Sequence, residues 1–135
     1  MIQTIIDNLY TFINQRPGLE PGNYDREGYL YDSRQITKDL HDARVLLTAV
    51  KWRHSIDAEA LIYAARHSWS GRLEIKPDGS IDYCTGQYWP TEYRKSVCAT
   101  LASALREYWR ADGVSDIRTK ARRELGRGVA ARWFN

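Results

Sequence analysis

The chain has 135 residues, of which 43% are hydrophobic and 27% are charged, a balance typical of one folded domain and unlike that of a disordered segment. The formal net charge is +3. The longest run of uncharged residues, 96–105, is too short to cross a bilayer. Residues 1–14 lack the pattern of a secretory leader. We therefore expect a single cytoplasmic domain over residues 1–135 that makes no membrane contact.

Three helices are predicted in the N-terminal half. Residues 3–16 carry apolar side chains at helical spacing, and Pro17-Gly18 ends that helix. The third helix begins at about Asp57, a good N-cap, and ends before Ser70-Gly71. The second helix is the longest, from about residues 25–27 to residue 53, and its packing seam consists of Tyr29, Ser33, Ile36, Leu40, Ala43, Leu47 and Val50. The same seam makes a homodimer one of our expectations.

A β-hairpin is predicted next. Residues 72–76 and 80–83 alternate polar and apolar side chains, which is typical of strands with one buried face. Pro77-Asp78-Gly79 joins them, with proline where a turn needs a fixed backbone angle and glycine where it needs a left-handed residue. Because two strands alone are marginal in water, the hairpin is expected to pack on helices.

Two helices are predicted in the C-terminal part. The fourth begins at Pro90 and runs to about residue 111; the fifth follows the N-cap Ser115 and ends at Gly126-Arg127-Gly128. The tail, residues 129–135, is expected to dock on the body of the protein, because it contains the apolar pair Trp133-Phe134. The elements together predict an α+β fold that is predominantly helical, with about five helices and one β-hairpin packed on them.

The positive charge is concentrated near the C-terminus. Residues 1–112 carry 14 Lys/Arg and 15 Asp/Glu, whereas residues 113–135 carry six Lys/Arg and two Asp/Glu. Guanidinium groups suit phosphates, and neutralising phosphates gives sequence-independent affinity for nucleic acid. We therefore predict a nucleic-acid-binding face made by Arg118, Lys120, Arg122, Arg123, Arg127 and Arg132. The alternative is a helix whose cations are merely solvated or paired with acids of the same chain.

Two adjacent aromatic residues form a second candidate site. Tyr88 and Trp89 follow Gly86 in the loop between the predicted hairpin and the fourth helix. Exposed, they would anchor a protein partner or stack on bases. Buried, they would cover the core and brace the start of the helix.

The sequence predicts no catalytic residue, metal site or cofactor. His41, His54 and His67 lack the spacing of zinc motifs, and Cys84 and Cys98 are expected to be buried free thiols. The paired carboxylates, such as Asp39 with Asp42, are expected to be solvated on a helix surface. An enzyme whose site is assembled from residues far apart in the sequence is kept as an alternative.

The stretch SGRLEIKPDGSIDYCTGQYWPTEY, residues 70–93, resembles small proteins of bacterial phages and mobile elements. The resemblance implies a small accessory protein that acts by binding, and it assigns no individual residue. Our leading prediction is therefore a non-enzymatic protein that engages nucleic acid or a nucleoprotein complex through its basic C-terminal face. A protein–protein inhibitor or adaptor of a bacterial defence or regulatory complex, using exposed aromatic residues, is the alternative.

Overall fold

A computed structural model of the chain describes residues 2–14, 33–51, 58–67, 74–82 and 90–135; for residues 12–14, 33–37, 82, 90–94 and 96 only the backbone is described. These ranges contain α1 (Ile2–Asn14), α2 (Ser33–Lys51), α3 (Ala58–Arg66), β1 (Glu74–Ile75), β2 (Ile81–Asp82), α4 (Pro90–Ala111), α5 (Ile117–Leu125) and α6 (Arg127–Trp133). The prediction of a predominantly helical chain is confirmed. No helix within these ranges is long and apolar enough to cross a membrane.

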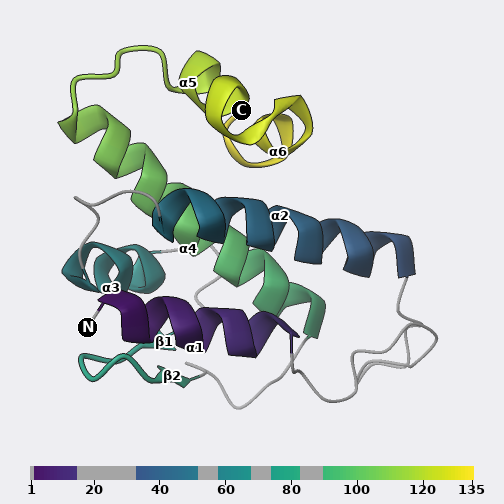
Figure 1. The fold of residues 1–135 in the computed structure, drawn as a ribbon, viewed down its shortest axis with the longest axis vertical. Helices are drawn as coiled ribbons and strands as arrows, with labels where there is room; N and C mark the ends of the chain where they lie inside the picture. Colours follow the sequence, from purple (N-terminus) through teal and green to yellow (C-terminus); the bar gives the residue numbers. More distant parts are fainter. Residues whose placement is uncertain (1, 15–32, 52–57, 68–73, 83–89) are drawn as a thin grey trace.

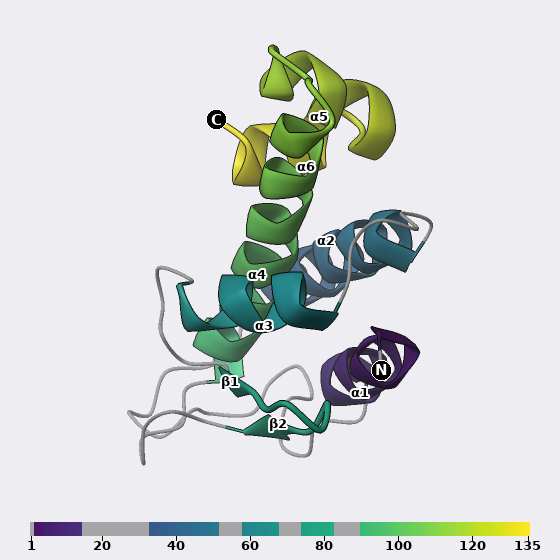
Figure 2. The same cartoon turned by 90° about the vertical axis from the view of Figure 1, so that its left-hand side faces the viewer.

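Helices α2 and α4 cross at the centre of the molecule (Figure 1). Helix α4 contacts α2, α3, α5 and α6, so it is the element around which the others are arranged. Figure 2 shows α5 and α6 at one end of α4, and α1 with the two strands near the other end. The core between these helices contains the fully buried side chains of Leu46, Leu61, Leu101, Leu105 and Trp109.

The packing face of α2 differs in part from the predicted seam. Ala43, Leu47 and Val50 are buried as predicted, but Leu40 is only partly buried. The remaining predicted seam residues lie outside the described side chains. Ala43, Leu47 and Val50 are buried within one molecule and offer no free surface, and the homodimer stays a prediction.

The described β structure is small. Strands β1 and β2 pair antiparallel over two residues each, with Glu74 opposite Asp82 and Ile75 opposite Ile81. Longer strands are predicted over residues 72–76 and 80–83, but residues 72, 73 and 83 lie outside the described residues. Lys76 and Ser80 flank the turn, and the Lys76 N–H donates a 2.8 Å hydrogen bond to the Ser80 carbonyl oxygen. The longer strands are therefore not established.

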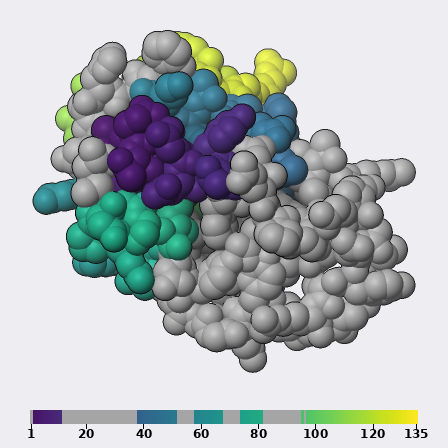
Figure 3. Space-filling view, turned by 60° about the horizontal axis from the view of Figure 1, so that its bottom comes forward, coloured from purple at the N-terminus to yellow at the C-terminus, as the bar shows by residue number. Residues whose placement is uncertain are grey.

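The turn between the strands lies against α1. Gly79 has a φ of +88°, the left-handed conformation predicted for it. The Asn8 side chain donates a 2.7 Å hydrogen bond to the Gly79 carbonyl oxygen, and a Cβ placed on Gly79 would lie 3.1 Å from Thr4 Cγ2. Figure 3 shows α1 and the strand region side by side on this face. Glycine is therefore favoured here by the backbone conformation, and the close approach of α1 leaves little room for a Cβ atom.

The C-terminal segment is more helical than predicted. Gly126, at φ +88°, ends α5, and its N–H bonds to the carbonyl oxygen of Arg122. The prediction that the helix breaks at residues 126–128 was therefore right for α5, but a second short helix, α6, begins immediately at Arg127. The prediction of an ordered tail is confirmed, since the Phe134 side chain is only 4% exposed and packs on Trp109.

Candidate nucleic-acid interface

The six predicted cations all lie on α5 and α6, but they have different surroundings. The Lys120 ammonium pairs with the Glu124 carboxylate at 2.9 Å, one turn along the same helix. Arg132 pairs with Asp42 of α2, which is far away in the sequence. The remaining four have exposed side chains: Arg118, Arg122, Arg123 and Arg127.

The exposed arginines lie on both α5 and α6, two helices that contact each other. Arg118 and Arg122 are one turn apart on α5, Arg123 is the next residue, and Arg127 is the first residue of α6. Within the described part of the chain, their guanidinium groups make no hydrogen bond or ion pair. These four cations therefore keep their donors available for an external anion.

Both acidic side chains of residues 113–135, those of Asp116 and Glu124, already have hydrogen-bond or ion-pair partners within the segment. Asp116, and not the predicted Ser115, is the N-cap of α5: its carboxylate accepts hydrogen bonds from the Thr119 N–H at 3.1 Å and the Thr119 hydroxyl at 2.7 Å. These bonds lower the pKa of Asp116, with a smaller contribution from the positive charge of Arg122. Because Glu124 is paired with Lys120, the local acids leave most of the arginine charge uncompensated.

Arg132 differs from the other predicted contact residues because it holds α6 on α2. Its Nε and Nη2 atoms donate hydrogen bonds of 2.6 Å each to the two carboxylate oxygens of Asp42. This is the bidentate geometry in which an arginine binds a carboxylate most strongly. The Asp42 side chain is 1% exposed and the Arg132 side chain 36% exposed, so the pair lies at the edge of the core.

Further contacts hold the end of the chain. The Trp133 indole N–H donates a 3.0 Å hydrogen bond to Asp42, and Arg106 donates a 2.9 Å hydrogen bond to the Trp133 carbonyl oxygen. The Arg106 guanidinium also lies 5.1 Å from the centre of the Phe134 ring, which packs on Trp109. We call this set the C-terminal latch: Asp42, Arg106, Trp109, Arg132, Trp133 and Phe134.

The charge state of Asp42 follows from the latch. Burial alone raises the pKa of a carboxyl group, but hydrogen bonds from Arg132 and Trp133, with the nearby His41, outweigh it. The pKa of Asp42 is therefore lowered, and the group is ionised in the folded protein at neutral pH. The prediction that Asp39 and Asp42 are solvated is wrong, because both are buried. Asp42 lies four and eight residues before the buried Leu46 and Val50, and this helical spacing could have indicated its burial.

The absence of a side chain at Gly128 leaves space for the guanidinium group of Arg132. A Cβ on Gly128 would lie 3.2 Å and 3.4 Å from the two terminal nitrogens of the guanidinium, one turn further along α6. The sequence motif Gly126-x-Gly128 therefore has two separate uses: the first glycine ends α5, and the second leaves room for the latch.

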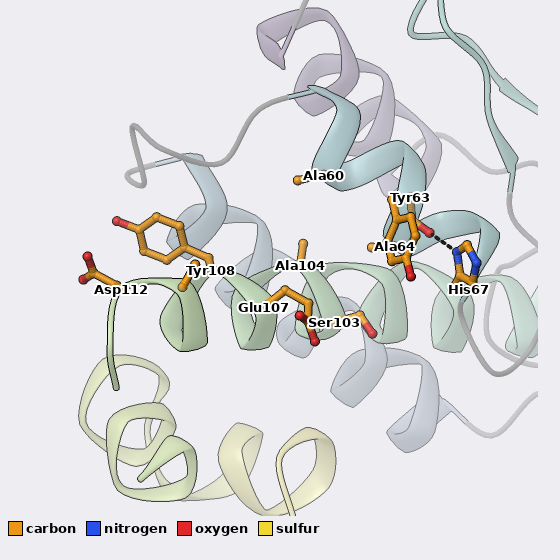
Figure 4. A pocket seen from close by; sticks show the side chains of 10 residues that line it. Ala60, Tyr63, Ala64, His67, Ser103, Ala104, Glu107, Tyr108 and Asp112 are labelled. Carbon is orange, nitrogen blue, oxygen red and sulfur yellow. Dashed lines mark hydrogen bonds between the residues drawn. The ribbon is translucent and has the colours of Figure 1, made fainter. Parts of the chain in front are cut away.

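A groove of about 710 Å³ lies between α3 and α4, and the sequence did not predict it. Its floor consists of the small side chains of Ala60, Ala64 and Ala104 (Figure 4). Tyr63 and His67 stand at one end, with their rings stacked at 4.0 Å and the His67 Nδ1 atom 2.9 Å from the Tyr63 carbonyl oxygen.

Tyr108 and Asp112 stand at the other end of the groove, and Glu107 and Ser103 lie along its α4 side (Figure 4). The part of the lining that the structure describes therefore contains two carboxylates and no lysine or arginine. The Tyr63 side chain is 60% exposed, one of two large hydrophobic side chains that are largely exposed in the described part of the chain.

The other predicted residues are only partly placed. Tyr88, Trp89, His54 and Cys84 lie outside the described residues, so the predictions for them stay predictions. Cys98 is completely buried, and burial raises the pKa of its thiol, which opposes formation of a thiolate.

Comparisons of the chain with protein-family models, curated proteins and solved structures find no match. In its described residues the chain is predominantly helical, with exposed arginines on α5 and α6 and a groove between α3 and α4 that contains two carboxylates.

Proposed function

We propose that this chain is a non-enzymatic binding protein that contacts nucleic acid, free or within a nucleoprotein complex, through the exposed arginines of α5 and α6. The observation that carries the proposal is the set of four exposed guanidinium groups without intramolecular partners in the described structure: Arg118, Arg122, Arg123 and Arg127. Lys120 contributes more weakly because of its ion pair with Glu124, and Arg132 acts in the latch instead.

Phosphate contacts are the chemistry that this face supports best. Nothing in its residues indicates base-specific readout, whereas planar guanidinium groups on one helical hairpin are suited to neutralising phosphates. Binding is expected to be sequence-independent, with dissociation constants of about 10⁻⁴–10⁻⁶ M near physiological salt. The resemblance of residues 70–93 to phage and mobile-element proteins is compatible with such an accessory role.

The test is the salt dependence of binding to a short random-sequence DNA duplex and to single-stranded RNA. If all four arginines contact phosphates of the duplex, the logarithm of the association constant falls with the logarithm of the salt concentration with a slope of about −3.6. The double variant Arg122→Ala plus Arg123→Ala should bring the slope to about −1.8.

Two controls separate this face from general positive charge. The variant Lys51→Ala plus Arg66→Ala removes two exposed cations from the ends of α2 and α3 and should leave the slope unchanged. Arg132→Lys keeps the charge but loses the bidentate pair, and it should also leave the slope unchanged while the protein is folded. Equal losses in the two double variants, or no binding at micromolar protein in low salt, would contradict the proposal.

A further inference from the structure

We propose that the groove between α3 and α4 is a docking surface for a basic segment of a protein partner, which places a Lys or Arg side chain between Tyr63 and Tyr108, beside Glu107. This inference does not depend on the nucleic-acid proposal. The groove uses α3 and α4, whereas the arginine face uses α5 and α6, and the two surfaces have opposite charge.

The charge of the lining determines the charge of the occupant. Among the described residues that line the groove, Glu107 and Asp112 carry carboxylates, and none is a lysine or arginine. The Glu107 carboxylate bonds to Arg110 at 2.8 Å, but both side chains are more than half exposed. An exposed pair of this kind contributes little to stability, so Glu107 can exchange Arg110 for an incoming cation at little cost.

The aromatic residues provide the anchoring contacts. Tyr63 is 60% exposed, yet its ring is stacked on His67, so little rotational freedom is left to lose on binding. Tyrosines in such positions are frequent anchors of protein interfaces, and the face of a tyrosine ring attracts ammonium and guanidinium groups. Tyr108 offers a second ring at the other end of the groove (Figure 4).

The shape of the groove favours a protein segment over a small organic cation. Small-molecule sites usually enclose most of the ligand surface, whereas this groove is open to solvent and has an exposed tyrosine at its rim. Its alanine floor allows a backbone to approach closely. From Ser103 on α4 to Asp112, just after the end of α4, the groove extends over roughly 13 Å, about two and a half helical turns.

The proposal is tested with the full chain and a fluorescein-labelled amphipathic peptide of Ala, Leu and Arg, followed by fluorescence anisotropy and by amide chemical shifts. A peptide with Gln in place of Arg is the neutral control. Binding of the Arg peptide is expected to shift amides of α3 and α4. Tyr63→Ala and Glu107→Lys should each weaken it about tenfold.

Variants of the same residue types outside the groove serve as controls for the two groove variants. Tyr10→Ala removes a largely exposed tyrosine on α1, and Glu59→Lys reverses an exposed acid of α3 that is not among the described lining residues. Both should bind like the unmodified protein, as should Arg122→Ala plus Arg123→Ala. Equal binding of the Gln peptide, unchanged binding by the two groove variants, or displacement of the peptide by spermidine at equimolar concentration would overturn the proposal.

Discussion

Arg132 and Asp42, 90 residues apart in the sequence, form two parallel hydrogen bonds of 2.6 Å that join the last helix to α2. Asp42 also accepts the Trp133 indole N–H, so one buried carboxylate holds two consecutive residues of α6. Asp42, in the first half of the chain, therefore helps to position α6, together with the contacts that α5 and α6 make with α4.

Removing Arg132 should destabilise the protein strongly. Arg132→Ala leaves the buried Asp42 charge with fewer partners, and we expect the free energy of unfolding to fall by about 2–3 kcal/mol, less than for a fully buried pair because Arg132 is 36% exposed. Urea denaturation of the two single variants and of Asp42→Ala plus Arg132→Ala measures the coupling. A coupling below about 0.5 kcal/mol would show that the pair is not the main contact of the latch.

Stability should decrease in acid because of Asp42. Its pKa is lowered in the folded protein, so its contribution is fully present above the pKa of the unfolded chain, near 3.8, and is lost as the pH falls through the folded pKa. The pKa values of Asp78 and Asp116 are lowered too, by hydrogen bonds from Ser80 and Thr119. The informative quantity is therefore the difference between the unmodified protein and Asp42→Asn.

That difference is measured by urea denaturation between neutral pH and the acid limit of folding. Asp42→Asn should be less stable than the unmodified protein at neutral pH, and the gap should narrow as the pH falls below about 4. A gap that stays constant over this range would mean that the charge of Asp42 does not stabilise the fold.

Gly79 and Gly113 give a matched pair of substitutions. Their φ angles are +88° and +84°, but a Cβ on Gly79 would lie 3.1 Å from Thr4 Cγ2, whereas one on Gly113 would meet nothing within 4 Å. Alanine at either position strains the backbone by about 1–2 kcal/mol. Thermal or urea unfolding should show a larger loss for Gly79→Ala, and equal losses would show that α1 yields to the added methyl group.

Cys98 should be inert toward thiol reagents in the folded protein. Its side chain is completely buried, and the raised pKa of its thiol disfavours the reactive thiolate. In a Cys84→Ser background, labelling should be slow under native conditions and rapid in denaturant. Rapid native labelling, at a rate that does not follow global unfolding, would contradict the described packing of α4 against α2.

The sequence alone determined the local features of this protein, because they depend on residues close together in the chain. Helical spacing indicated an apolar face on α1, Gly79 marked the left-handed turn residue, and the apolar Trp133-Phe134 pair indicated a docked tail. The concentration of arginines near the C-terminus was also a property of the sequence.

Only the tertiary structure decided what each arginine and acid does. Arg132 and Arg122 look alike in the sequence, yet one lies against a buried carboxylate of α2 and the other lies on the surface, because the partner of Arg132 is brought near by folding. The groove also depends on the packing of two helices. Alanines of α3 and of α4 form its floor only because α3 packs on α4. Contacts between distant residues depend on how helices pack, and helical spacing within one segment carries no information about them.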